Sequence, residues 1–282
     1  MILSLEAIRG RQNSAYSPSR VAIQNMPRLG ISSYTFVWAA GVPGYPPPPS
    51  PLTALDLLDK AVKLGVRVVQ IADNLPLDQL PETELKSLLD RAQDLNLEIE
   101  LGTRGIQAEH LRCQLQLATR FGARLLRVVT DTRTHRPLPG EVVAALAPLA
   151  TEFERAGVTL AIENHDRFKA ATLREIVTRI GSRHVGICFD TANSFGCLEG
   201  PEQVLETLGR HIVNFHLKDI CVCRPPHHKG FIMEGRPAGQ GQLDVPDLLK
   251  RLERFGVHPN VILELWPPPQ ASVSAAIEVE DK

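Results

Sequence analysis

Short runs of branched apolar residues alternate with amphipathic segments along this chain from Leu29 onward. A run of about five β-branched or aliphatic residues between turn residues predicts a buried strand, and apolar residues that recur with helical spacing predict a helix. The helical pattern at 53–65, for example, opens on Thr53 as an N-cap and closes on Gly65. The eight predicted strands cover residues 30–36, 66–72, 97–101, 124–130, 158–163, 184–190, 212–219 and 260–266.

Eight strands separated by helices predict an α/β protein with a single (β/α)8 TIM barrel. Continuous apolar runs are typical of parallel strands covered on both faces, and right-handed crossovers close such strands into a barrel. An open doubly wound sheet is the alternative, but no GxGxxG motif follows the first strand. We expect the barrel over 28–268, a disordered N-terminal extension over 1–27, a long loop over 221–242 and a frayed tail over 269–282.

The composition is that of an ordinary globular domain, with 282 residues, 43% hydrophobic, 22% charged and a net charge of −1. This balance gives no electrostatic reason to expect nucleic acid as a partner. Five cysteines without paired CxxC spacing favour free thiols in a reducing, cytoplasmic compartment. No apolar stretch approaches the roughly 20 residues of a membrane-spanning helix. Met26 directly precedes the first strand pattern, so translation from either Met1 or Met26 fits.

A polar residue with ligand chemistry closes each of the last four apolar runs. These residues are Glu163, Asp190, His216 and Glu264. The carboxyl ends of parallel barrel strands share one face, so the four side chains are expected to converge there. Carboxylates with one imidazole suit Mn²⁺, Mg²⁺, Co²⁺ or Zn²⁺ better than a soft metal. The sequence therefore predicts a site for one divalent cation, the alternative being a separate surface or strand-capping role for each residue.

Five segments around these strand ends form a set, reading IENHDRF, GICFDTANSFG, FHLKD, GRPAGQGQLD and ILELW. In order and spacing they resemble the sugar-phosphate isomerase and epimerase superfamily, also called the xylose-isomerase-like barrels. The resemblance implies that the four residues named above hold a single divalent cation. Two departures concern the substrate. Ketose 3-epimerases of this family typically have NRFE where this chain has DRFK, ending in Lys169, and a histidine where this chain has Asn193.

The predicted chemistry is isomerisation or epimerisation of a keto sugar or sugar derivative. A cation bound to the carbonyl would acidify the neighbouring C–H and stabilise an enediolate. Glu163 and Glu264 are the predicted catalytic residues, one removing the proton and the other returning it. The partner is a small-molecule sugar, and a homo-oligomer is compatible with this hypothesis.

Further residues on the same face are predicted to bind the substrate, because they follow strands or lie in the adjoining loops. For His165 and Arg236 a loop role is the alternative, and for Lys218 it is a buried ion pair at the strand end. The predicted substrate-binding residues are His165, Arg167, Asn193, Lys218, Arg236, Asp73 and Arg104.

Other functions stay open at this point. A metal-dependent lyase or dehydratase would begin with the same proton abstraction and then expel a leaving group from an oxidised glycoside or a dehydroshikimate-like acid. A non-catalytic sugar-binding protein would need no base. An abasic-site endonuclease is disfavoured, because strands two to four end without a histidine.

Overall fold

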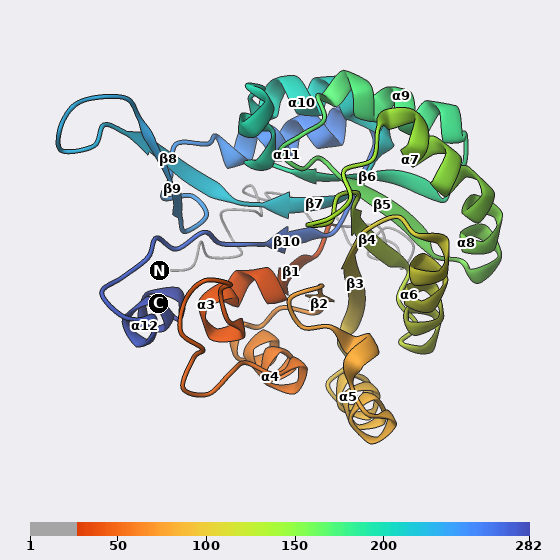
Figure 1. Cartoon of the computed structure of the whole chain (residues 1–282), viewed down its shortest axis with the longest axis horizontal. Helices are drawn as coiled ribbons and strands as arrows, with labels where there is room; N and C mark the ends of the chain where they lie inside the picture. The colour runs from red at the N-terminus through yellow and green to blue at the C-terminus, as the bar shows by residue number, and fades with distance from the viewer. Residues whose placement is uncertain (1–26) are drawn as a thin grey trace, which may run out of the picture.

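Eight parallel strands close into one barrel with helices around it in the computed structural model, which describes residues 27–282 (Figure 1). The strands follow their sequence order around the barrel, and the last of them closes the ring between the first and seventh. The predicted (β/α)8 barrel is thereby confirmed. The predicted N-terminal extension, apart from Pro27, lies outside the described residues. The barrel strands are β1 (Leu29–Ser32), β2 (Val68–Ile71), β3 (Glu98–Arg104), β4 (Leu125–Val129), β5 (Thr159–Glu163), β6 (Val185–Asp190), β7 (Ile212–Leu217) and β10 (Val261–Leu263).

The helices begin and end where local sequence signals favour it. Helix α4 starts after Thr53, whose side chain accepts from the Asp56 amide, and it ends at Gly65 with φ of 71°. Glycine adopts this left-handed conformation at the lowest cost, because it has no Cβ atom. The α-helices are α3 (Val37–Ala40), α4 (Ala54–Leu64), α5 (Glu82–Asp94), α6 (Ala108–Arg120), α7 (Pro139–Leu146), α8 (Ala150–Ala156), α9 (Ala170–Ile180), α10 (Pro201–Leu208), α11 (Val245–Arg254) and α12 (Val273–Glu280). The 3₁₀ helices are η1 (Ser33–Phe36), η2 (Leu77–Gln79), η3 (Ala147–Leu149), η4 (Asn193–Cys197) and η5 (Gly209–His211).

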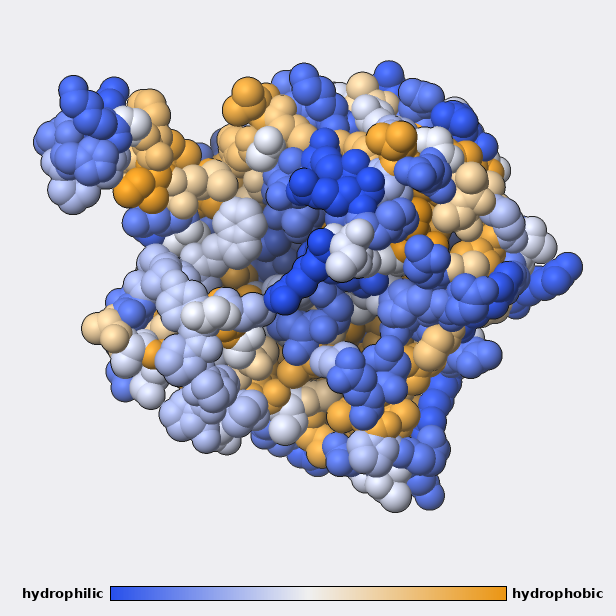
Figure 2. Space-filling view, viewed as in Figure 1, coloured by the Kyte–Doolittle hydropathy of each residue, from blue (hydrophilic) through white to orange (hydrophobic). Residues whose placement is uncertain are grey.

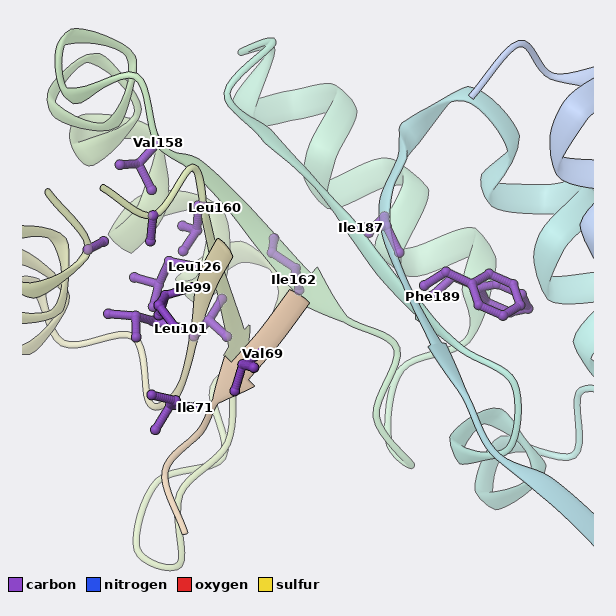
Figure 3. Close-up of a cluster of buried hydrophobic side chains, with 14 of the residues drawn as sticks. Val69, Ile71, Ile99, Leu101, Leu126, Val158, Leu160, Ile162, Ile187 and Phe189 are labelled. Carbon is purple, nitrogen blue, oxygen red and sulfur yellow. The ribbon is translucent and has the colours of Figure 1, made fainter. Parts of the chain in front are cut away.

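The core lies mainly between the strands and the surrounding helices. Val69 and Ile71 on β2 and Leu101 on β3 belong to this buried apolar layer (Figure 3). Because strand side chains alternate, the residues between them point to the other face. That inner face carries Gln70 and Glu100, which contact each other inside the barrel. The strands thus separate an apolar outer layer from a polar interior.

The strand register sets the heights of the residues that close β5, β6 and β7. Glu163 pairs with Cys188, and Asp190 pairs with His216. On the other side of β7, His216 pairs with Ile262 of β10, two residues before Glu264. The parallel register therefore brings the ends of four consecutive barrel strands to one rim.

The first strand and the loop after the seventh strand differ from the prediction. The first strand stops at Ser32 instead of continuing to residue 36, because the Ser32 hydroxyl accepts from the Tyr34 amide and caps helix η1. The predicted loop at 221–242 contains part of an antiparallel hairpin, β8 (Asp219–Cys223) with β9 (Ile232–Arg236). This hairpin extends away from the barrel (Figure 1), with hydrophobic residues nearer the barrel and hydrophilic residues at its end (Figure 2).

The C-terminal segment also differs from the predicted frayed tail. It forms helix α12, whose Glu280 carboxylate accepts from the Trp38 amide at 2.8 Å and the Ala39 amide at 2.9 Å. Glu280 is buried, and burial raises its pKa to about 7. The carboxylate caps the amino end of α3, so the tail docks onto the segment that follows β1.

Two further observations concern the whole described region. None of its helices combines the length and the apolar character needed to cross a membrane. All five cysteines are free thiols, as expected from their spacing.

Candidate metal centre

The structure brings Glu163, Asp190, His216 and Glu264 together at the carboxyl end of the barrel, and we call these four residues the ligand cluster. The His216 Nδ1 atom lies 3.3 Å from Glu264 Oε1, 3.9 Å from Glu163 Oε2 and 4.0 Å from Asp190 Oδ2. All four side chains are buried, with His216 and Asp190 fully so. Three acidic groups and an imidazole therefore share one enclosed space.

Each carboxylate of the ligand cluster is oriented by neighbours. Glu163 Oε1 accepts from Asn193 Nδ2 at 2.6 Å, and Glu264 Oε1 accepts from Ser32 Oγ at 2.9 Å. Asp190 Oδ1 accepts from the backbone amides of the following loop, at 2.8 and 2.9 Å. The predicted substrate residue Asn193 thus contacts a ligand carboxylate, and Ser32 holds a second one from the opposite end of the chain.

Lys218 lies between two of these carboxylates. Its Nζ atom is 2.6 Å from Asp190 Oδ2 and 2.8 Å from Glu264 Oε2, and it stands 5.0 Å from the centre of the Trp266 ring. Burial alone would lower the pKa of Lys218, but the adjacent carboxylates outweigh burial and raise it. Lys218 is therefore a permanent buried cation. A buried ion pair at the strand end was the predicted alternative to substrate contact for Lys218, and the structure contains this ion pair.

A second buried cation, Arg127 on β4, lies on the other side of the ligand cluster. Its Nε atom is 3.0 Å from Glu163 Oε2, and its Nη1 atom is 3.2 Å from Asp73 Oδ1. Asp73 also accepts from the Tyr34 hydroxyl at 3.1 Å and lies 3.5 Å from Arg104 Nε. The predicted residues Asp73 and Arg104 are thus linked to the ligand cluster through Arg127. Arg127 was not among the predicted site residues. A charged residue inside the apolar run at 124–130 could have indicated it, because arginine is rarely buried without a partner.

The ionisation of the ligand cluster follows from these contacts. Burial alone would raise the pKa of Glu163 and Glu264, but the nearby cations and the imidazole outweigh burial and lower both pKa values. Burial alone would lower the pKa of His216, yet Glu264 and Glu163 outweigh burial and raise it. The two glutamates are therefore held as carboxylates, which makes them good cation ligands and weak bases.

The donor atoms fit a divalent cation. Both ring nitrogens of His216 and the Oε2 atom of Glu163 are buried and make no well-aligned hydrogen bond among the described residues, although Oε2 lies within ion-pair distance of Arg127 and Nδ1 within that of Glu264. Buried polar atoms are nearly always paired, so unpaired ones at a site need an explanation. One donor atom from each of Asp190, His216 and Glu264 lies within 4.8 Å of the others. Oxygen and imidazole ligands suit the hard and borderline cations from Mg²⁺ to Zn²⁺.

Three predicted substrate residues lie outside this arrangement. Arg167 makes two 2.7 Å contacts with Asp131, and Arg236 pairs with Glu234 on the hairpin. His165 Nδ1 is 2.7 Å from its neighbour Asp166. These contacts engage the three side chains in their loops, and none of the three pairs with the ligand cluster.

Comparisons with known proteins support the barrel and add a sequence relative. A family model described as a xylose isomerase-like TIM barrel matches residues 58–279. A protein of Pectobacterium atrosepticum named 3-oxo-isoapionate decarboxylase is 33% identical over 253 residues, which are 90% of each chain. A crystal structure of D-psicose 3-epimerase in the presence of D-fructose has a TM-score of 0.66 and 15% identity, over 89% of each chain. A Mycobacterium smegmatis xylose isomerase-like barrel in complex with magnesium has a TM-score of 0.67 and 12% identity, over 90% of this chain and 94% of that one.

Proposed function

The chain belongs to the xylose isomerase-like TIM barrel family, and from that premise we propose that it is a metal-dependent decarboxylase of 3-oxo sugar acids. The relative that carries a decarboxylase name is similar over nearly the whole of both chains, whereas the epimerases are similar at a level that supports the fold alone. Decarboxylases are lyases, so the proposal falls in the class that the sequence offered as its alternative. The substrate differs from the glycosides and dehydroshikimate-like acids considered there.

The buried cations beside the ligand carboxylates are the observation that carries this proposal. The three carboxylates of the ligand cluster, together with Arg127 and Lys218, carry one net negative charge when His216 is neutral. Asp73, which also contacts Arg127, is offset by Arg104. A divalent cation held by the ligand cluster would turn this into one net positive charge. A substrate carboxylate would then balance it, whereas a neutral ketose would leave it uncompensated in a low-dielectric site.

The proposed decarboxylation depends more on a group that stabilises the electron pair of the broken C–C bond than on a base. In a 3-oxo acid the ketone is two carbons from the carboxylate, so loss of CO₂ leaves an electron pair that spreads onto the ketone oxygen as an enolate or enediolate. A cation bound at the ligand cluster would supply Lewis acidity for this oxygen. Arg127 and Lys218 keep their protons, since their pKa values are raised, and their positive charge favours the developing anion. A proton from water then replaces the lost carboxyl group.

Isomerisation or epimerisation is the second candidate, and the placement of Glu163 and Glu264 favours it. They close β5 and β10, the two ends of the half-ring formed by β5, β6, β7 and β10. Two carboxylates in such an arrangement could serve a substrate from two sides. Their lowered pKa values oppose this use, because a carboxylate stabilised by a buried cation is a weaker base.

One experiment separates these activities. Protein stripped with a chelator and supplied with Mn²⁺ is incubated with 3-oxo-isoapionate and, separately, with D-allulose. We expect one CO₂ per 3-oxo acid consumed, little turnover without the cation, and no isobaric product from the ketose. Asp190→Asn should lower the rate at least about 100-fold, because even residues that merely orient metal ligands cost about 10- to 100-fold. Asp94→Asn, at an exposed position of helix α5, is the control. An isobaric ketose product without CO₂ release would favour the epimerase.

A further inference from the structure

Glu280 on helix α12 is a buried acid that binds the backbone of another helix. Helix α12 packs beside α3 (Figure 1), and Ala276, one turn before Glu280, is fully buried. The Glu280 carboxylate accepts from the Trp38 amide at 2.8 Å and from the Ala39 amide at 2.9 Å. Burying a carboxylate costs free energy that an apolar residue at this position would avoid. An acid here is therefore explained by the α3 backbone that it holds in place.

The indole of Trp38 extends this contact toward the metal centre. Its Nε1 atom donates to the Pro267 carbonyl oxygen at 3.0 Å. Pro267 directly follows Trp266 and begins a run of three prolines over 267–269. Proline fixes its own φ angle and restricts the preceding residue to extended conformations, so this segment is stiff. A hydrogen bond that holds Pro267 therefore also limits where Trp266 can lie.

Trp266 connects the stiff segment to the ligand cluster. Its ring centre lies 5.0 Å from the Nζ atom of Lys218, and a cation near an indole ring is attracted to it. The same Nζ atom pairs with Asp190 and Glu264. Glu264 itself precedes Pro267 by three residues. The position of Pro267 therefore affects both a carboxylate of the ligand cluster and its counter-ion.

Hydrogen bonds on either side of Glu264 join the same two parts of the chain. The Thr35 hydroxyl donates to the Leu263 carbonyl oxygen at 2.5 Å. The Leu265 amide donates to the Tyr34 carbonyl oxygen at 3.3 Å. The segment that follows β1 is thus bonded to the segment around the end of β10, and α12 holds the first of these segments from its other side.

We propose that Glu280 is a positioning residue for Glu264 of the ligand cluster and acts through Trp38. Docking of α12 fixes α3, and the Trp38 indole then holds the segment after β10 against the ligand cluster. The inference rests on the metal site of the proposed function, and it adds that metal affinity depends on the docked C-terminal helix. The alternative is a local role, in which Glu280 stabilises α3 and metal affinity is independent of it.

Calorimetric titration of chelator-treated protein with Mn²⁺ tests the inference. Glu280→Gln keeps the shape of the side chain but turns its NH₂ group toward one of the two donor amides. Glu278→Gln is the matched change at an exposed position of α12. Glu280→Gln should weaken Mn²⁺ binding about 10-fold, the lower end of the loss when groups that orient metal ligands are changed, and Glu278→Gln should match wild type. Unchanged Mn²⁺ affinity in Glu280→Gln, with or without a loss of thermal stability, would overturn the inference.

A second variant tests the route through Trp38. Trp38→Phe removes the indole N–H that bonds Pro267 and leaves the backbone amide that Glu280 holds. It should weaken Mn²⁺ binding by a similar factor. The double variant with Glu280→Gln should bind about as weakly as the weaker single variant, because both changes interrupt one connection. Independent effects would multiply to about 100-fold in the double variant and would contradict the role given to Trp38.

The affinity measurement separates this inference from the proposed decarboxylation. If the wild type binds Mn²⁺ but releases no CO₂ from 3-oxo-isoapionate, the proposed function fails, and the weaker Mn²⁺ binding of Glu280→Gln still supports the inference. If CO₂ is released and Glu280→Gln binds Mn²⁺ like the wild type, the inference fails and the proposed function stands. A wild type that binds no Mn²⁺ would overturn both.

Discussion

Two buried polar clusters lie inside this barrel, and their buried carboxylates are stabilised in different ways. The ligand cluster at the carboxyl end balances its carboxylates with full charges. Deeper in the barrel, Glu100 is surrounded by the side-chain amides of Gln70, Asn214 and Asn260, and we call these four residues the amide cluster. Glu100 Oε2 accepts from Gln70 and Asn214 at 3.0 Å each, and Oε1 accepts from Asn260 at 2.8 Å.

The difference shows which cluster is arranged for a ligand. In the amide cluster three neutral donors satisfy the Glu100 carboxylate, and burial raises the pKa of Glu100; the one atom of this cluster without a hydrogen-bond partner among the described residues is the neutral amide oxygen Oε1 of Gln70. In the ligand cluster both His216 nitrogens lack a partner, and the buried cations lower the pKa of the glutamates. Neutral donors can satisfy the hydrogen-bonding capacity of a buried carboxylate. Charged carboxylates that keep unused donor atoms form a site that suits a cation. The same barrel thus holds a fully hydrogen-bonded Glu100 carboxylate beneath the proposed metal site.

The largest expected effect comes from removing the Lys218 ammonium group, which pairs with two carboxylates of the ligand cluster. Lys218→Met should destabilise chelator-treated protein by about 3–5 kcal/mol, because Asp190 and Glu264 lose a buried counter-ion. Added Mn²⁺ should recover most of this loss, so the metal-dependent shift in Tm becomes larger than in wild type. Thermal unfolding with and without Mn²⁺ measures both. The exposed Lys63→Met is the control, and a variant that Mn²⁺ does not rescue would show that the ammonium and the metal do not share ligands.

A smaller effect is expected in the amide cluster. Glu100→Gln places an NH₂ group where a carboxylate oxygen accepted hydrogen bonds, so the variant should lose about 1–3 kcal/mol of stability. Its metal content and turnover should match wild type, because these amides contact no ligand carboxylate. Urea unfolding and metal analysis test the pair of expectations. Glu109→Gln, at an exposed position of helix α6, should change stability by less than about 1 kcal/mol. Loss of metal in Glu100→Gln would refute the separation of the two clusters.

The smallest effect is a difference in pH dependence. Glu264 has a lowered pKa, so its contribution to stability is present above the ordinary glutamate pKa of 4.5 and is lost as the pH falls through the folded value. Glu100 has a raised pKa, so its contribution is complete below 4.5 and is lost as the pH rises through the folded value. Each slope is at most about 1.4 kcal/mol per pH unit.

Urea unfolding between pH 2 and 8 in the presence of a chelator measures these slopes. Relative to wild type, Glu264→Gln should flatten the acid side of the profile and Glu100→Gln should flatten the side toward neutral pH. Identical profiles for the two variants would contradict the contrast drawn between their environments.

The fold and the ligand positions were accessible from sequence because both depend on local periodicity. Apolar runs of strand length mark the strands, and a residue that closes such a run lies at the carboxyl rim of any parallel barrel. The end of the first strand and the C-terminal helix were less accessible. Ser32 stops β1 through a side-chain cap, and Glu280 docks α12 through two distant amides. Such contacts depend on neighbours that the local pattern does not contain.

The sequence by itself therefore determined the barrel and the four residues at its rim. Only the tertiary structure decided which charges meet. Closure of the ring places Ser32 and Lys218 on Glu264, and the side-by-side packing of β4 and β5 places Arg127 on Glu163. Periodicity along the chain specifies where a side chain points, whereas its partners are specified by strands and helices that lie far away in sequence.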